Sequence, residues 1–273
     1  MEITNVKKLL PILLCALLIM SGCGKTVSNG LMKNASPGTS ALSFYTYDGK
    51  TVTDSTIFDT PTTQRLLNEL DAVKATAADN WSLEDITLPI YGLNIGDING
   101  WGIFVAWSNG YWITQTGKAY KFNYDFAALA EKYPVSDKRE FSDFSVMPCA
   151  YHLAQDENGW SSALLTPAAE QKAPDGIAMS LEAWNKDAVT VNIKNNSGED
   201  WMYGEYFGLE VQLDGVWYGI PTTPENWGFP SIGLIVPSGK TREHTYTLSM
   251  YGELPAGTYR LVTHGLSVEH AAA

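Results

Sequence analysis

The strongest constraint on this fold is a two-residue alternation of apolar and polar side chains in the last hundred residues. Apolar side chains occupy every second position of four stretches, at residues 179–183, 189–193, 207–213 and 246–250. Successive side chains of a β-strand point to opposite faces, so each stretch is expected to be a strand with one buried face. Turn residues separate the stretches and no helical period intervenes. The pattern therefore predicts two sheets packed face to face.

A series of short motifs runs through the same region. They read NNS at 195–197, YG at 203–204, LEV at 209–211, DGVWY at 214–218, PSGK at 237–240 and LPAGTYRLV at 254–262. In this order the motifs resemble the bacterial immunoglobulin-like domains of Firmicutes lipoproteins. The resemblance implies an immunoglobulin-like β-sandwich at residues 175–270, a structural or binding module that does not by itself imply an activity. The cysteine pair of antibody domains is absent, so Trp217 and Tyr259 would have to supply core bulk.

Residues 41–166 combine helix and strand signals. Thr60 suits a helix N-cap and Pro61 the first helical position, and an apolar stripe follows at Leu66, Leu67, Leu70 and Val73. Strands are expected at 41–47, 51–58, 86–95, 101–107, 111–116 and 119–122. Three links between them suit tight hairpins, at Asn99-Gly100, Asn109-Gly110 and Thr116-Gly117. A second helix near residues 125–133 and a hairpin joining 148–154 to 160–165 complete a predicted α+β domain.

The predicted fold is therefore mainly β, with an N-terminal α+β domain followed by an immunoglobulin-like β-sandwich. Hydrophobic residues make up 45% and charged residues 18% of the 273-residue chain, as in globular proteins that bury real cores. The segment 167–174 is rich in Ala, Pro and polar residues. We expect it to be the linker between a domain of unknown function at 41–166 and the sandwich at 175–270.

The amino-terminal segment has the features of an export signal. Lys7 and Lys8 precede twelve apolar residues at positions 9–20. As a helix this stretch would be about 18 Å long, whereas a bilayer core of about 30 Å needs a longer span. Residues 1–22 are thus expected to be a signal peptide rather than a transmembrane helix, and residues 23–40 a flexible tether of small polar residues.

The sequence Met20-Ser21-Gly22-Cys23 resembles the lipobox of bacterial lipoproteins. In that family, Leu is usual where this chain has Met20. The resemblance implies that Met20, Ser21 and Gly22 are recognised by the signal peptidase and that the Cys23 sulfur receives a diacylglyceryl group and becomes the new amino terminus. Two acyl chains hold a protein firmly on a bilayer. The expected location is the outer face of the bacterial cytoplasmic membrane.

Charge and cysteine content limit the partners. The formal net charge is −12, and loss of Glu2, Lys7 and Lys8 with the leader would make it −13. Such a surface repels phosphate backbones, so we expect no nucleic-acid partner. Cys15 would be lost with the leader and Cys23 would carry lipid. Cys149 would then have no partner for an intrachain disulfide.

The motifs that could carry chemistry are weak. Cys149 and His152 suggest a thiol protease, but residues three apart on a strand point to opposite faces. The four histidines, at 152, 244, 264 and 270, lack metal-ligand spacings, so no metal and no cofactor are expected. We therefore expect a protein that is not an enzyme.

Tryptophans are the one positive indication of a ligand. Exposed Trp faces stack on sugar rings, and the candidates for ligand contact are Trp101, Trp107, Trp112 and Trp160. The leading hypothesis is a lipid-anchored, non-enzymatic binding or structural module. Its partners would be the membrane, through lipid on Cys23, and cell-wall glycan or another surface protein. Two alternatives remain open: a glycan hydrolase using carboxylates of the first domain, and a regulator or inhibitor of a neighbouring membrane enzyme.

Overall fold

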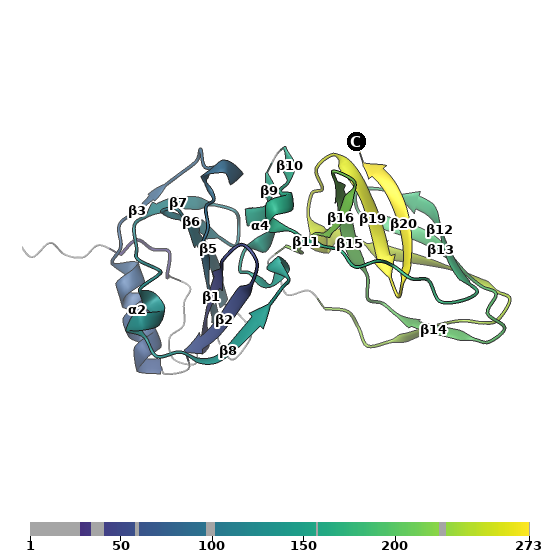
Figure 1. The fold of residues 1–273 in the computed structure, drawn as a ribbon, viewed down its shortest axis with the longest axis horizontal. Coiled ribbons are helices and arrows are strands. Elements are labelled where there is room, and N and C mark those ends of the chain that lie inside the picture. The colour runs from purple at the N-terminus through teal and green to yellow at the C-terminus, as the bar shows by residue number, and fades with distance from the viewer. Residues whose placement is uncertain are drawn as a thin grey trace, which may run out of the picture.

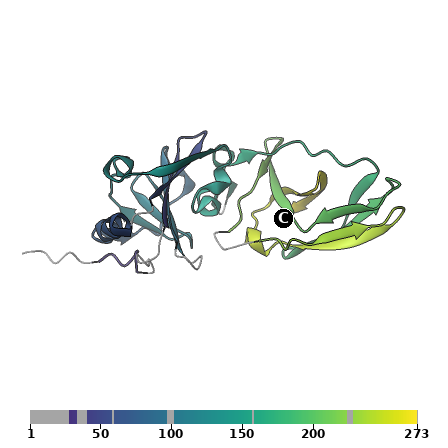
Figure 2. The ribbon, with the colours of Figure 1, turned by 90° about the horizontal axis from the view of Figure 1, so that it is seen from below.

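The computed structural model describes residues 28–33, 41–57, 60–96, 102–156, 158–223 and 228–272. The molecule is elongated and mainly β. Figure 1 shows the elements from β1 to β8 toward one end, those from β12 to β20 toward the other, and α4 and β11 between them. The view turned by 90° keeps the same division (Figure 2). The predicted fold class is confirmed: an α+β domain is followed by a β-sandwich.

The first domain is built on one eight-stranded antiparallel sheet. Its strands, in the order β3-β7-β6-β5-β4-β1-β2-β8, are β1 (Ala41–Tyr47), β2 (Val52–Ile57), β3 (Ala75–Ala77), β4 (Ile90–Gly96), β5 (Gly102–Ser108), β6 (Tyr111–Thr114), β7 (Ala119–Phe122) and β8 (Ser136–Phe141). Asn109 and Gly110 join β5 to β6 with φ of 48° and 80°. Both values lie in the left-handed region, as a two-residue hairpin requires and as predicted. Asn99 and Gly100 lie outside the described residues.

Two helices follow the predicted apolar patterns to different extents. Helix α2 (Thr60–Asp71) buries Leu66, Leu67 and Leu70 against one face of the sheet. Helix α3 (Leu129–Lys132) has only four residues and begins later than predicted. The Asp125 carboxylate accepts a hydrogen bond from the amide of Ala128, which holds a turn where the prediction placed helix. A short 3-10 turn, η1 (Leu83–Asp85), precedes β4.

The predicted hairpin at 148–154 and 160–165 is wrong. Residues 150–154 form helix α4 (Ala150–Ala154), flanked by the 3-10 turns η2 (Phe144–Val146) and η3 (Ser162–Leu164). Only the two-residue strands β9 (Gln155–Asp156) and β10 (Gly159–Trp160) pair here. An apolar stretch this short has no resolvable period, so the sequence does not separate strand from helix.

The second domain consists of facing sheets with short connections. Its strands are β11 (Thr166–Pro167), β12 (Ile177–Trp184), β13 (Ala188–Asn195), β14 (Trp201–Gly204), β15 (Gly208–Leu213), β16 (Val216–Gly219), β17 (Gly233–Val236), β18 (Thr241–Thr247), β19 (Gly257–Thr263) and β20 (Leu266–Ala272), with a 3-10 turn η4 (Ser249–Tyr251). They form three sheets, ordered β11-β16-β15-β19-β20, β12-β13-β18 and β14-β17. The predicted alternation is confirmed in β13, where Val189, Val191 and Ile193 are all buried.

The two aromatic residues expected to fill the sandwich core lie on opposite faces. Tyr259 has no exposed surface and lies in the core. Trp217 pairs with Gln212 on the outer face, where the Arg260 guanidinium lies 4.5 Å from its ring. Tyr259 therefore fills the core of the sandwich, and Trp217 does not.

The segment 28–33, expected to belong to the tether, is packed against α2. The Asn29 side chain donates hydrogen bonds to the carbonyls of Leu70, at 2.7 Å, and Val73, at 3.0 Å. Met32 is buried beside the helix. The last carbonyls of a helix lack intrahelical partners, and α2 has no basic residue in its last turn. Asn29 therefore supplies hydrogen-bond donors to the last carbonyls of α2 and holds residues 28–33 against the helix.

The connection between the domains is held by contacts along its length. Thr166 and Pro167 form β11 and pair with Gly219 and Tyr218 of β16. Farther on, a Cβ at Gly265 would lie 2.1 Å from the Lys172 carbonyl oxygen, so only glycine lets the connection pass there. One hydrophobic cluster also runs from the first domain, through α4, into the sandwich. The two domains therefore share a packed core. No helix among the described residues is long and apolar enough to cross a membrane.

Candidate functional site

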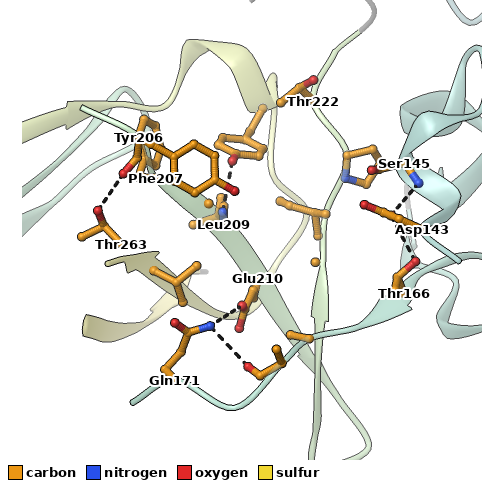
Figure 3. Close-up of a pocket in the computed structure, with 18 of the residues that line it drawn as sticks. Asp143, Ser145, Thr166, Gln171, Tyr206, Phe207, Leu209, Glu210, Thr222 and Thr263 are labelled. Carbon is orange, nitrogen blue, oxygen red and sulfur yellow. Dashed lines mark hydrogen bonds between the residues drawn. The ribbon is translucent and has the colours of Figure 1, made fainter. Parts of the chain in front are cut away.

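The candidate site is a groove between the two domains. A hollow of about 720 Å³ is lined from the first domain by Asp143 and Ser145 and from the second by Tyr206, Glu210 and Thr222 (Figure 3). Ligand sites prefer domain interfaces and usually enclose about 300–1,000 Å³. A second hollow of about 210 Å³ shares Ser145 and Thr222 with the first. We refer to the two hollows together as the junction groove.

The first domain contributes one face of its sheet. Tyr45 of β1, Asn94 of β4 and Phe104 of β5 line the smaller hollow. Helix α4 and the residues before it cover the rest of this face. A Cβ at Gly92 would lie 2.8 Å from the Pro148 ring, so the strand needs glycine directly beneath that cover. The uncovered part of the face is the floor of the smaller hollow.

Asn94 of the smaller hollow carries a buried acceptor. Its Oδ1 atom is buried and has no hydrogen-bond partner among the described residues. Tyr45 lies on the same face, and burial is the main cause that raises the pKa of its hydroxyl. An atom with no accessible surface is out of reach of a ligand in the hollow. The hydrogen-bonding side chains that the smaller hollow offers are those of its more exposed lining, such as Ser145 and Thr222.

A small network shapes the rim of the groove. The Asp143 Oδ1 atom accepts hydrogen bonds from the Ser145 amide, at 2.9 Å, and from the Thr166 hydroxyl, at 3.1 Å. The Thr166 hydroxyl oxygen in turn accepts from the Phe144 amide at 3.0 Å. Figure 3 shows the two hydrogen bonds that Asp143 accepts, and the network ties η2 to the start of the connection. Asp143 has a structural role here.

An aromatic pair, exposed Tyr206 and half-buried Phe229, forms the wall on the second domain. The Tyr206 side chain is 60% exposed, and its ring meets that of Phe229 edge to face at 5.3 Å. The backbone below is fixed, because the Thr263 hydroxyl donates to the Tyr206 carbonyl at 2.6 Å. Phe229 also packs against the buried Phe207. The wall thus presents an apolar ring face on a rigid support.

The charged groups at the base of the groove are paired. Glu210 of β15 is 5% exposed and forms an ion pair with Arg260, its direct neighbour on β19. The Gln171 amide of the connection also donates to Glu210, at 3.4 Å. Burial raises the pKa of Glu210, and Arg260 opposes that rise. The pair neutralises the base and holds the connection to the sheet.

Comparison with protein families identifies the second domain. Residues 175–272 match the family model of a bacterial Ig-like domain. The match spans β12 to β20, which confirms the predicted immunoglobulin-like β-sandwich. No curated protein and no solved structure matches the chain. The Ig-like domain indicates a surface binding or structural module.

Three of the four tryptophans predicted to contact a ligand, Trp107, Trp112 and Trp160, lie away from the junction groove. Trp112 has no exposed surface and belongs to the core beneath α2, so its prediction as a ligand contact is corrected. Trp107 lies on the same buried side and donates from Nε1 to the Phe122 carbonyl at 2.8 Å. Trp160 donates to the Tyr259 hydroxyl of the Ig-like domain at 3.0 Å. Trp101, Met20, Ser21, Gly22 and Cys23 lie outside the described residues.

Cys149 and His152 each have their own partner. The Cys149 thiol is buried, donates to the Phe104 carbonyl at 3.3 Å, and has its pKa raised by burial. The His152 Nε2 atom lies 3.0 Å from the Gln115 carbonyl oxygen, and burial lowers its pKa. A neutral buried thiol is a poor nucleophile. Within the described part of the chain, no group of three or more His, Cys, Asp or Glu side chains could hold a metal ion.

Most of the residues that line the groove carry no signal in a single sequence. Tyr206 and Phe229 lie in loops beside strands, where no period assigns a side chain to a face. Asn94 sits inside a strand otherwise rich in apolar residues. A polar residue at such a position is the one hint that its face is not fully covered.

Proposed function

We propose that this protein is a lipid-anchored, non-enzymatic binding module on the outer face of a bacterial cytoplasmic membrane, and that its ligand binds in the junction groove. The presence of this groove is the observation that supports a binding role. The likeness of residues 20–23 to a lipobox and of the C-terminal motifs to the Ig-like domains of Firmicutes lipoproteins supports the location.

The chemistry of the groove fits a segment of cell-wall glycan. A sugar ring has an apolar face, which the Tyr206 and Phe229 rings can contact, and hydroxyl groups that can form hydrogen bonds with the Ser145 and Thr222 hydroxyls lining the groove. Arg260 is paired with Glu210 at the base of the groove, and among the described residues no Lys or Arg lines the two hollows, so the groove offers little to a strongly anionic ligand. A neutral polyhydroxylated ligand therefore fits best.

Calorimetric titration with soluble peptidoglycan fragments tests this function. We expect Tyr206→Ala to weaken binding roughly two- to tenfold, because an aromatic contact contributes about 0.5–1.5 kcal/mol. The matched control is Val216→Ala, an exposed apolar side chain of β16 outside the groove, which should bind as the wild type does. Equal affinity of all three proteins would show that the ligand does not bind in the junction groove. Absence of any glycan binding would refute the proposed ligand.

The hydrolase alternative requires two catalytic carboxylates in the same groove. They would have to act as acid and base on either side of the scissile bond. Asp143 and Glu210 are the carboxylates that line the described groove, and both are engaged by neighbouring side chains. Release of soluble fragments from peptidoglycan by the purified protein, lost in Asp143→Asn, would favour that alternative over the binding module.

A further inference from the structure

We infer that the C-terminal end of α2, together with residues 28–33, is the surface that faces the bilayer, and that the Ig-like domain is presented away from it. The inference rests on the proposed lipid on Cys23 and adds to it a fixed orientation and a contact with lipid headgroups.

The first step is that described residues close to Cys23 in the sequence are fastened to α2. The amide of Asn29 donates to the Asp71 carbonyl at 3.0 Å, and the Ser28 hydroxyl donates to the Asp71 carboxylate at 2.8 Å. With the two side-chain hydrogen bonds of Asn29 to Leu70 and Val73, these contacts fasten the segment to the end of α2.

The second step is the reach of the intervening chain. Ser28 is the fifth residue after Cys23. A polypeptide spans at most about 3.6 Å per residue, so Ser28 lies within about 18 Å of an anchored Cys23 whatever the conformation between them. That distance is about the length of α2 itself, at 1.5 Å for each of its twelve residues. The end of α2 cannot leave the neighbourhood of the bilayer.

The third step is charge. Lys33 and Lys74 are both exposed at this end of the domain, where the Asp71 carboxylate also lies and accepts from Ser28. The two lysines outnumber that carboxylate, in a chain whose net charge is −12. Anionic headgroups attract basic side chains within a Debye length and repel the acidic remainder. Charge therefore favours the same orientation as the short reach.

The consequence concerns the rest of the molecule. Figure 1 shows α2 near one end of the long axis and β14 near the other. With the α2 end at the bilayer, the junction groove lies farther out and the β14–β17 sheet is the most distant part. The protein would hold its groove toward the cell wall.

Energy transfer to labelled lipid measures this orientation. The lipid-modified protein would be reconstituted in vesicles of anionic phospholipid that carry an acceptor dye on a small fraction of headgroups. Donor dyes would be attached to Ala72→Cys at the end of α2, an exposed position that leaves both lysines in place, or to Met202→Cys in β14, a residue that is 69% exposed. The buried Cys149 thiol leaves the introduced cysteine as the reactive position. We expect strong loss of donor fluorescence at position 72 and little at position 202.

Two variants separate the anchor from the orientation. Cys23→Ser should abolish transfer from both positions, whereas a Gly/Ser spacer of about twelve residues inserted before Ser28 should reduce transfer from position 72 alone. Asn29→Ala should act in the same direction to a smaller extent, because it removes the two side-chain hydrogen bonds to Leu70 and Val73. Equal transfer from positions 72 and 202 in protein bound through its lipid would overturn the orientation only. Failure of the protein with an intact Cys23 to carry lipid and bind vesicles would overturn the anchor as well.

Discussion

At the scale of single residues, the surroundings decide what a side chain can do. Cys149 and His152 suggested a catalytic pair from the sequence, yet one donates to the Phe104 carbonyl and the other contacts the Gln115 carbonyl. Cys149 adopts a left-handed conformation, with φ of 60°, at the residue before α4. The sequence contains both residues but not this turn, which is why their geometry could not be predicted.

His152 should make stability depend on pH. Burial lowers its pKa, so the unfolded chain takes up a proton at higher pH than the folded protein does. Below the ordinary histidine pKa of about 6.5, protons bind the unfolded state preferentially and the free energy of unfolding falls. We expect urea midpoints of the wild type to drop between about pH 7.5 and about pH 5.5, and to drop less in His152→Gln. His244 titrates in both proteins, so the difference isolates His152. An identical drop would contradict this account.

At the scale of elements, the sequence predicted those with a long period or a defined turn. The strands of the Ig-like domain alternate over several residues, and Asn109-Gly110 requires positive φ, so both were predictable. The five residues of α4 are too few for a period, and their helix depends on packing against the first sheet. The groove depends on how two domains meet, which no local pattern in the chain encodes.

The tryptophans of the first sheet should differ sharply in their contribution to stability. Trp112 is fully buried, with its ring 4.6 Å from that of Phe122, so Trp112→Ala should cost about 3–5 kcal/mol. Trp107→Phe keeps most of the aromatic volume and removes the hydrogen bond to the Phe122 carbonyl, so it should cost roughly 0.5–1.5 kcal/mol. Chemical denaturation followed by fluorescence would rank the two variants. A mild effect of Trp112→Ala would mean that this side chain is not in the core.

At the scale of the whole molecule, anchoring, packing and groove form one arrangement. The shared hydrophobic cluster joins the domains, and the connection runs over the outer face of the Ig-like domain, where Gln171 reaches Glu210. A groove between domains that move freely would have no fixed shape. Here the junction is packed, so the groove can be preformed and carried as a unit on the proposed anchor.

Membrane fractionation of wild type and Cys23→Ser, after a wash at high salt, tests the central claim most directly. Salt screens the contact of exposed lysines with headgroups, so only a covalent lipid should retain the protein. The account predicts wild type in the membrane fraction and Cys23→Ser in the soluble fraction. Equal retention of both proteins in the membrane fraction would contradict it.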